Sequence, residues 1–470
     1  MAEPPAPDEF ELPWRRRPSS PPATALFLVI VWSLEEPERT GEAAEVVEGG
    51  LLGRGEPEAG EARLSFGPTR AAAAETRTWL EASRLSREQL HFSGVSAEQA
   101  WVESIGRCPL AVNGSPVTKA LVKPGDAITL RNAMVLLVTQ RPRASEPARH
   151  AAEDFPFGDA DRHGLVGESI ALWSLREALA FAGRSREHVL LLGESGSGKE
   201  LSARAIHESS ARAERTMVSR SAATLPEALV DAELFGNAKN YPNPGMAERA
   251  GLLGEAHEST LFLDEIGELS TTAQAHLLRV MDAGDYQRLG EPKQRRSDFR
   301  LIAATNREPG ALKHDFAARF PLRVRLPGLN ERREDVPLLI RRLLLRLCAS
   351  SEGLLERFFE RRQGRLAEPR VEPELVEWLL RHRFTTHVRE LERLLWVAIS
   401  TSQDDFIAAT PDFLREVAPG LDFEAPEPER EAIESALASA KGNVTKAARL
   451  LGLRNRYVLY RMMKKVGLES

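Results

Sequence analysis

The spacing of apolar and polar residues changes several times along the chain, and each spacing predicts a different architecture. From residue 23 to residue 140, short apolar alternations are separated by Gly, Pro and Asn turns, which is typical of a β-sandwich. From residue 161 to residue 328, apolar strands alternate with helical patterns, which predicts a parallel α/β domain. The pattern over residues 329–402 is helical, and we expect a smaller, all-helical lid there.

Proline-rich and charged segments separate these regions. The first 22 residues are rich in Pro and charge, which predicts disorder. We expect linkers at residues 141–160 and 403–426, and a last, helical domain at residues 427–470. A length of 470 residues with 42% hydrophobic and 28% charged residues fits a multidomain globular protein.

The apolar run at residues 23–34 has two interpretations. It follows Arg15, Arg16 and Arg17, an arrangement that resembles a secretory signal. However, two prolines precede the run, and it ends in the acidic sequence EEPE without a small-residue cleavage site. We therefore interpret it as a buried first strand. No other stretch has membrane-spanning length.

Charge and cysteine content limit the classes of function that are possible for the protein. The two cysteines, Cys108 and Cys348, cannot build a disulfide framework, so we expect a cytoplasmic protein. The net charge of −6 argues against a protein whose whole surface binds nucleic acid. However, the stretch from Lys441 to Leu468 contains eight Lys or Arg and no Asp or Glu. This local basic segment indicates a dedicated nucleic-acid-binding end.

A glycine-rich octad, GESGSGKE, follows the apolar run Val189–Leu192 and precedes a helical pattern. A strand, such a loop and a helix in this order cradle phosphates, because the glycines let backbone N–H groups face phosphate oxygens. Glu200 stands where the general motif has Ser or Thr for magnesium. A glycine-rich turn without function is the alternative. The predicted nucleotide-binding residues of the loop are Gly193, Glu194, Ser195, Gly196, Ser197, Gly198, Lys199 and Glu200.

Two further apolar strands end in polar residues. TLFLDEI delivers Asp264 and Glu265 to a strand end, where ligands bind in open α/β sheets. We expect Asp264 to hold Mg²⁺ or its water and Glu265 to orient or deprotonate the attacking water. RLIAATN ends in Thr305 and Asn306, which places a polar side chain near the γ-phosphate of ATP. An ordinary exposed strand end is the alternative for each motif taken alone.

These motifs together resemble the AAA+ ATPases of bacterial enhancer-binding proteins, which activate sigma-54 RNA polymerase. GESGSGKE is similar to their Walker A motif, including the Glu, and LFLDEIGEL to their Walker B motif. LVGES, LPEALVDAELFG, RLIAATNR, LPGLNERREDVPLL and HVREL match in order, over about residues 160–400. The resemblance implies that Val166 and Gly167 lie near the adenine, that Arg389 reaches the phosphates from the lid, and that Arg319 is an arginine finger in a ring, typically a hexamer.

The chain departs from the family at four places. NYPNPG, Asn240–Gly245, replaces the family loop GAFTGA, which presses on the sigma factor. Ser221 replaces an Asn that restrains the catalytic Glu, and Lys313 replaces a second arginine finger. FTTH, Phe384–His387, replaces the usual lead-in to the sensor Arg. Two hypotheses follow: an ATP-hydrolysing activator, or a nucleotide-binding DNA regulator that has lost contact with sigma-54 and acts without motor activity.

The C-terminal segment predicts three helices, with turns at Gly442 and Gly452, and a helix-turn-helix formed by the last two. It resembles the Fis-type DNA-binding domain, which implies a two-fold dimer on an inverted repeat of double-stranded DNA. A three-helix protein-binding bundle is the alternative. The residues predicted to contact bases or phosphates are Arg454, Asn455, Arg456, Tyr457, Lys446, Arg461, Lys464 and Lys465.

In the N-terminal region, the segments LLGRG, LSREQ and VNGSPVTKALVKPGDAITL together resemble a forkhead-associated domain, which binds phosphothreonine peptides. The predicted phosphopeptide contacts are Arg54, Ser86, Arg87 and Asn113. Gln89 stands in place of the family's His, and Cys108 and Pro109 in place of its first Asn-Gly. A degenerate sandwich that serves as an interaction scaffold is the alternative. The partners expected overall are DNA, copies of this chain, sigma-54 RNA polymerase and a phosphothreonine protein or kinase, with no membrane.

Overall fold

The chain divides into two compact units, Met1–Ala409 and Thr410–Ser470. The computed structural model describes residues 23–68, 77–143, 155–226, 229–307, 312–362, 365–418, 430–440, 442–444, 447, 459, 460, 463 and 468. The predicted disordered segment 1–22 lies outside the described residues. Within the described ranges, no helix is long and apolar enough to cross a membrane.

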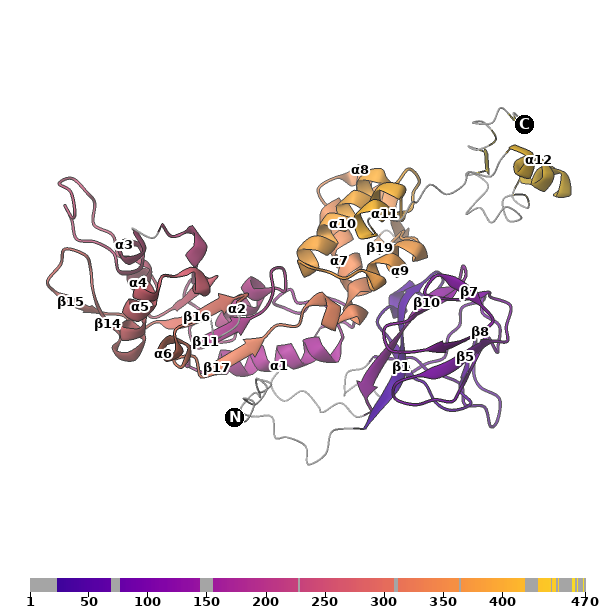
Figure 1. The fold of residues 1–470 in the computed structure, drawn as a ribbon, viewed down its shortest axis with the longest axis horizontal. Coiled ribbons are helices and arrows are strands. Elements are labelled where there is room, and N and C mark those ends of the chain that lie inside the picture. Colours follow the sequence, from indigo (N-terminus) through magenta and orange to yellow (C-terminus); the bar gives the residue numbers. More distant parts are fainter. Residues whose placement is uncertain are drawn as a thin grey trace, which may run out of the picture. The chain divides into compact units, whose positions relative to one another are not determined.

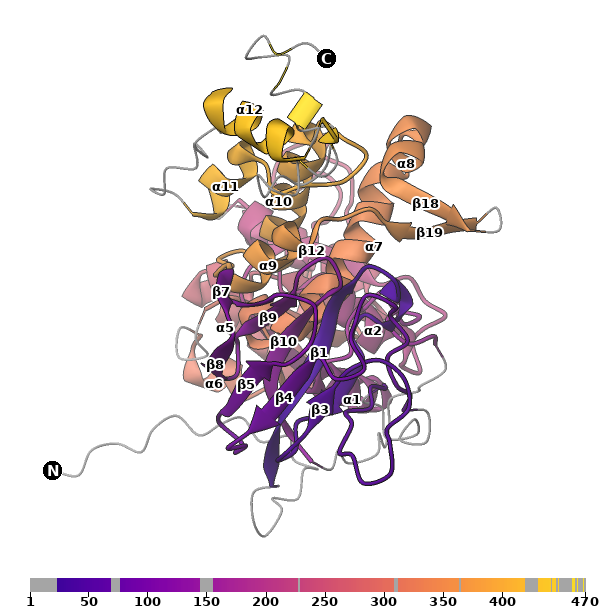
Figure 2. The ribbon, with the colours of Figure 1, turned by 90° about the vertical axis from the view of Figure 1, so that its right-hand side faces the viewer.

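The first unit begins with two antiparallel sheets that share one hydrophobic core, and we call this part the N-terminal two-sheet domain (Figure 2). One sheet has six strands in the order β2-β1-β10-β9-β6-β7, and the other has four in the order β3-β4-β5-β8. Leu28, Leu136 and Phe92 are fully buried in the shared core. The strands are β1 (Thr24–Ser33), β2 (Ala43–Glu45), β3 (Leu51–Leu52), β4 (Leu90–Ser93), β5 (Ala100–Ser104), β6 (Leu110–Val112), β7 (Ser115–Val117), β8 (Lys119–Val122), β9 (Ala127–Leu130) and β10 (Met134–Pro142).

A five-stranded parallel sheet follows, in the order β12-β13-β16-β11-β17, with helices on both faces (Figure 1). Successive residues of a strand face opposite ways, so Val189 packs with helices α1 and α2 while Leu190 packs with α3 to α6. This arrangement confirms the predicted α/β domain. Its elements are α1 (Ile170–Arg184), β11 (Val189–Leu192), α2 (Lys199–Glu208), β12 (Val218–Ser221), α3 (Val230–Phe235), α4 (Leu252–Glu255), β13 (Thr260–Asp264), α5 (Thr271–Ala283), β16 (Arg300–Thr305), α6 (His314–Ala317) and β17 (Leu322–Arg325).

The lid is mostly helical, with helices α7 (Val336–Cys348), α8 (Glu352–Phe358), α9 (Pro373–Arg381) and α10 (His387–Thr401). It also contains an antiparallel hairpin, β18 (Phe359–Arg362) and β19 (Arg365–Pro369), so the expectation of an all-helical lid was wrong. Pro369 ends β19, and Pro373 occupies the first turn of α9, a position that suits proline. A second hairpin, β14 (Asp285–Gln287) and β15 (Gln294–Arg296), lies between α5 and β16 and was not predicted.

Strand β1 is buried on both faces, which explains its uninterrupted apolar sequence. Leu26, Leu28 and Ile30 face the shared core of the two sheets. Phe27 and Val29, which point the other way, are also buried, and α9 of the lid packs on β1 and β10. The apolar run of the sequence is therefore a buried strand, as predicted.

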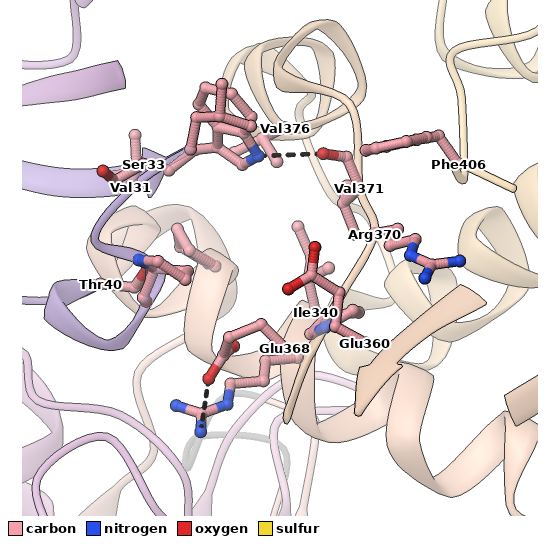
Figure 3. A pocket seen from close by; sticks show the side chains of 16 residues that line it. Val31, Ser33, Thr40, Ile340, Glu360, Glu368, Arg370, Val371, Val376 and Phe406 are labelled. Carbon is pink, nitrogen blue, oxygen red and sulfur yellow. Dashed lines mark hydrogen bonds and ion pairs between the residues drawn. The ribbon is translucent and has the colours of Figure 1, made fainter. Parts of the chain in front are cut away.

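Polar contacts join the N-terminal two-sheet domain to the lid. The indole N–H of Trp32 donates to the carbonyl of Val371 at 2.9 Å, and both residues line a cavity of about 100 Å³ (Figure 3). Towards the other end of β10, the Arg141 guanidinium donates two hydrogen bonds, of 3.0 and 2.6 Å, to one carboxylate oxygen of Glu334. The side chains of Arg141 and Glu334 are only 3% and 11% exposed.

The second unit contains two described helices, α11 (Pro411–Val417) and α12 (Arg430–Ser439). Helix α12 confirms the first helix predicted for the C-terminal domain, and Ile433, Ala447 and Leu459 are buried in one small core. Helix α11 lies where a linker was expected, so that boundary was wrong. Thr410 caps it by accepting a hydrogen bond from the N–H of Phe413, and Pro411 occupies its first turn.

Candidate nucleotide-binding site

The phosphate-binding loop connects β11 to α2 as the sequence predicted. Gly196 and Gly198 have φ angles of +80° and +99°, a region that other residues adopt rarely, so the loop requires glycine at both positions. The Lys199 ammonium donates to the carbonyls of Gly193 at 2.9 Å and Glu194 at 3.1 Å. Burial lowers the pKa of Lys199, while the carboxylates of Asp264 and Glu265 act in the opposite direction.

Glu200 occupies the position at which the general motif has a hydroxyl. It lies in the first turn of α2, where its side chain is 70% exposed and 3.6 Å from Arg204. An acidic group there interacts favourably with the positive end of the helix. The Ser197 hydroxyl, inside the loop, donates to the carbonyl of Glu194 at 2.9 Å.

Asp264 ends strand β13 and Glu265 follows it, at the carboxyl end of the sheet. An Asp264 carboxylate oxygen accepts the backbone N–H of Glu265 at 2.9 Å. The Ser221 hydroxyl, from the end of β12, donates to the Glu265 carboxylate at 3.1 Å. Strands β13 and β11 run parallel with β16 between them, so their carboxyl ends bring the two carboxylates to the same end of the sheet as the phosphate-binding loop.

Asn306 follows the neighbouring strand and is exposed. Strand β16 pairs with β11 so that Thr305 lies beside Leu192, and the N–H of Gly193 donates to the Thr305 carbonyl at 3.2 Å. This pairing places Asn306 at the base of the phosphate-binding loop.

Among the described residues, no group of three or more His, Cys, Asp or Glu is arranged to hold a metal ion. Magnesium in nucleotide sites is usually bound by one or two carboxylates together with phosphates and water. Asp264 fits that requirement, because its second carboxylate oxygen is not used by the Glu265 N–H.

The lid contacts the phosphate-binding loop through the start of α10. The Arg389 guanidinium donates to the Ser195 hydroxyl at 2.9 Å. The N–H of Val388 donates to the Gly196 carbonyl at 3.3 Å. Arg389 is separated from Ser195 by 194 positions in the sequence, and the fold brings them together.

The segment of residues 166–169, which the family resemblance implies lies near the adenine, is held by Asp335, which sequence reasoning missed. Its carboxylate accepts hydrogen bonds from the N–H groups of Glu168 and Ser169, at 2.7 and 2.8 Å. A Cβ atom at Gly167 would lie 2.4 Å from the Asp335 carboxyl carbon, so only glycine fits there. Burial raises the pKa of Asp335 to about 6, and Arg332 opposes this. Val166, beside Gly167, is buried. The sequence signal that could have indicated Asp335 is its place as the last residue of NERRED, directly before α7.

Arg319 and Lys313 do not lie with Lys199, Asp264 and Glu265 in this chain. Arg319 is exposed and pairs with Asp282 at 2.6 Å, and Lys313 is exposed before α6. Among the described residues, no hydrogen bond or ion pair joins either cation to Lys199, Asp264 or Glu265.

Comparison with known proteins places these features in one family. A family model for the sigma-54 interaction domain matches residues 165–329, and a model for the Fis family of bacterial regulatory proteins matches residues 425–465. The transcriptional regulatory protein ZraR of Salmonella typhimurium is 32% identical over 363 residues, which cover 73% of this chain and 77% of ZraR. The chain belongs to the sigma-54-dependent enhancer-binding regulators.

Other relatives cover parts of this enhancer-binding regulator. The Nif-specific regulatory protein of Bradyrhizobium diazoefficiens is 41% identical over 240 residues, which cover 50% of this chain and 39% of that protein. Among solved structures, NtrX from Brucella abortus in complex with ATP is 25% identical with a TM-score of 0.47, and covers 64% of this chain and 69% of NtrX.

Residues at which this enhancer-binding regulator departs from its family make hydrogen bonds to their neighbours. Ser221 reaches Glu265 despite being shorter than the family Asn. In the lead-in FTTH, the Glu390 carboxylate accepts the N–H groups of Thr385 and Thr386, at 2.6 and 3.0 Å. These two bonds satisfy backbone donors ahead of α10.

The loop NYPNPG forms a closed, exposed turn. The N–H of Asn240 donates to the Met246 carbonyl at 2.9 Å, and the Asn240 side-chain carbonyl accepts the N–H of Gly245 at 2.9 Å. Buried Asn237 donates to three carbonyls at the base of the loop. The loop of this regulator is thus held by its own asparagines.

The predicted DNA contacts of this regulator cannot be placed. Arg454, Asn455, Arg456, Tyr457, Lys446, Arg461, Lys464 and Lys465 lie outside the described residues. The Fis family match over residues 425–465 supports the helix-turn-helix prediction for this segment.

Three of the four predicted phosphopeptide residues lie together. The N–H of Arg54 donates to the Ser86 carbonyl at 3.0 Å, and Arg87 follows Ser86 in the same exposed loop. Asn113 lies instead in the β6–β7 turn, where its side chain contacts Asp126 and the N–H of Ala127. No described contact joins Asn113 to the other three.

Proposed function

We propose that this regulator binds ATP with Mg²⁺, hydrolyses it in a ring of subunits, and is held on double-stranded DNA by its C-terminal domain. The observation that carries the proposal is the convergence of Lys199, the carboxylates Asp264 and Glu265, and Arg389 at one edge of the sheet. Such a regulator would act in the cytoplasm, where its DNA is.

Each side chain has a role that follows from its position. Lys199 and the loop N–H groups would hold the phosphates, and Asp264 would hold magnesium, which neutralises phosphate charge. Glu265 would accept a proton from the attacking water, with its orientation set by Ser221. Arg319 and Lys313, both exposed, would complete the site of the next subunit in a hexamer.

The central test is ATP turnover by the full chain against a Lys199→Ala variant. We expect turnover by the native chain and none by the variant. The same preparation, incubated with sigma-54 and a transition-state mimic of the phosphoryl group, reports whether the ring engages the sigma factor. Turnover no higher than that of the variant would exclude the ATPase.

The second candidate function is a DNA-binding regulator in which nucleotide is a structural ligand. The NYPNPG loop favours it, because it contains two prolines and lacks the threonine hydroxyl and the first and fifth glycines of the family loop. This candidate predicts nucleotide binding without sigma-54 capture. Transcription from a sigma-54 promoter driven by this protein would contradict it.

We propose that residues 23–140 are a forkhead-associated-like β-sandwich that senses a phosphothreonine protein and gates ring assembly. Support comes from the shared loop position of Arg54, Ser86 and Arg87, which suits a phosphate. Titration of the full chain with a phosphothreonine peptide and its unphosphorylated form tests this, with Ser86→Ala as the control. Equal binding of the two peptides would leave only a scaffold function.

The C-terminal domain is proposed to bind an inverted repeat as a dimer through residues 427–470. The Fis family match and the basic composition of this segment support the proposal. Removing a lysine or arginine that contacts phosphate lowers the salt dependence of DNA binding. Removing one that contacts a base relaxes sequence specificity instead. Comparing Lys464→Ala with Arg454→Ala on one DNA site separates the two roles.

A further inference from the structure

His387 is buried where the lid meets the phosphate-binding loop. Its side chain is 2% exposed, and its backbone has a φ of +48°. The ring atom Nδ1 accepts the N–H of Leu329 at 3.3 Å. Nε2 lies 3.1 Å from a carboxylate oxygen of Glu194 but is not aligned for a hydrogen bond to it. The ring therefore contacts the segment that enters the lid, at Leu329, and the loop at Glu194.

Gly328 makes room for this ring. The backbone of Gly328 has φ −69° and ψ 164°, a conformation that any residue adopts, so its backbone does not require glycine. A Cβ atom at this position would lie 2.6 Å from Cε1 and 2.7 Å from Nε2 of His387. The absence of a side chain at residue 328 is thus explained by the imidazole.

The residues on either side of His387 touch the phosphate-binding loop directly. A Cβ atom at Gly196 would lie 2.2 Å from the Thr386 carbonyl oxygen, which shows how closely the two backbones approach. Val388 and Arg389 donate hydrogen bonds to the carbonyl of Gly196 and the hydroxyl of Ser195. Displacement of the His387 ring would move these contacts with it.

We propose that His387 and Gly328 are a matched pair that positions residues 386–389 of the lid on the phosphate-binding loop. His387 is a positioning residue for nucleotide binding, and acts through Arg389. The Glu194 carboxylate is 69% exposed, so its attraction to the ring contributes little. The ring is located mainly by Gly328 and the N–H of Leu329. This inference rests on the proposed binding of ATP.

The experiment measures binding of a fluorescent ATP analogue to the full chain. His387→Asn keeps a residue that tolerates positive φ but is too short to fill the space beside Gly328. We expect affinity to fall about three- to tenfold, as for the loss of one hydrogen bond. The matched control is His188→Asn, because the His188 Nδ1 also accepts a backbone N–H, from Leu301 at 2.9 Å, at the opposite end of β11. That variant is expected to keep native affinity.

A second variant tests the pairing itself. Gly328→Ala is expected to weaken binding by a similar factor in the native background, because the new methyl group displaces the imidazole. In the His387→Asn background the same change is expected to have no further effect, because the ring is gone. Native affinity of Gly328→Ala, or losses that multiply in the double variant, would overturn the pairing.

The two proposals fail differently. If neither the native chain nor Lys199→Ala binds the analogue, the proposed nucleotide binding is wrong and this inference falls with it. If the native chain binds and His387→Asn binds equally well, only the positioning role is wrong. Thermal unfolding without nucleotide is measured for each variant, and a loss of affinity in His188→Asn equal to that in His387→Asn would assign the effect to stability and overturn the inference.

Discussion

At the scale of single residues, Glu265 combines an uncommon backbone with a restrained side chain. Its φ of +53° is a conformation that residues other than glycine adopt rarely, and such conformations concentrate at functional sites. The Ser221 hydroxyl holds one of its carboxylate oxygens at 3.1 Å. The backbone and the serine together determine where the carboxylate of Glu265 points.

Replacement of Glu265 by Gln should separate nucleotide binding from hydrolysis. The amide has nearly the same shape but cannot accept a proton from water, so we expect turnover to fall by about 100-fold or more while ATP affinity stays near native. Lys199→Ala, in contrast, should lose binding. Turnover assays and analogue titration on both variants check this, and equal turnover by native protein and Glu265→Gln would remove Glu265 from the reaction.

The stability of the lid should depend on pH through the carboxylate of Glu390. Burial alone raises its pKa, but hydrogen bonds from the His382 ring and the backbone N–H groups of Thr386 and Thr385 lower it from 4.5 to about 2. A pKa that is lower in the folded state stabilises the fold above pH 4.5, and this contribution is lost as the pH falls from 4.5 towards 2.

We therefore expect Glu390→Gln to lower the free energy of unfolding by about 1–2 kcal/mol at pH 7. The difference from the native chain should shrink at pH 4 and below. Urea unfolding at the two pH values measures it. A difference that does not depend on pH would show that the carboxylate charge has no part in the stabilisation.

Sequence reasoning at this scale found residues that lie close together in the chain. Lys199 and its loop, or Asp264 and Glu265, occupy positions that local backbone geometry determines. It missed Asp335, whose partners Glu168 and Ser169 are 167 and 166 positions away in the sequence. Sequence reasoning also grouped Asn113 with Ser86. Cys108, which hydrogen bonds to Gln89, lies before strand β6, whereas Asn113 lies after that strand.

At the scale of elements, the NYPNPG loop is a stiff turn in the position of the family's output loop. Proline locks φ and lacks an N–H, and Asn240 closes the turn through two hydrogen bonds. We therefore expect this loop to make fewer contacts with the sigma factor than a flexible loop.

Replacing residues 240–245 by GAFTGA should increase capture of sigma-54 in the presence of ATP and a transition-state mimic. The graft restores a threonine hydroxyl and two glycines without changing loop length. The matched control, Pro242→Ala with Pro244→Ala, loosens the loop but adds neither. Gel filtration of the trapped complex measures capture, and equal capture by the native chain and the graft would show that the loop sequence is not limiting.

Errors of prediction at this scale came from short elements. Helix α11 is only seven residues long, and hairpin β18–β19 has strands of four and five residues. Segments of this length contain too few repeats for hydrophobic periodicity to identify them. The long, strongly periodic helix α10 and the apolar strands β11 and β13 were predicted correctly.

At the scale of the first compact unit, the buried pair Arg141–Glu334 links the N-terminal two-sheet domain to the residue before Asp335. We expect Arg141→Ala to destabilise the unit by about 3–5 kcal/mol, because the Glu334 carboxylate would remain buried without its partner. The matched control, Arg143→Ala, removes a pair with Glu45 in which the arginine is 62% exposed, and should cost less than about 1 kcal/mol. Denaturant unfolding of both variants tests the pair, and equal losses would show that Arg141 is not buried in solution.

Local sequence was sufficient for the phosphate-binding loop, the carboxylates after β13 and the buried first strand. Their geometry follows from neighbouring residues: glycine allows positive φ, and an apolar strand places the next residue at a sheet edge. Tertiary structure alone decided that His387 faces Gly328, that Arg389 reaches Ser195, and that Arg141 meets Glu334. These contacts join residues 59 to 194 positions apart, and which distant side chains meet depends on how whole domains pack, which no local pattern encodes.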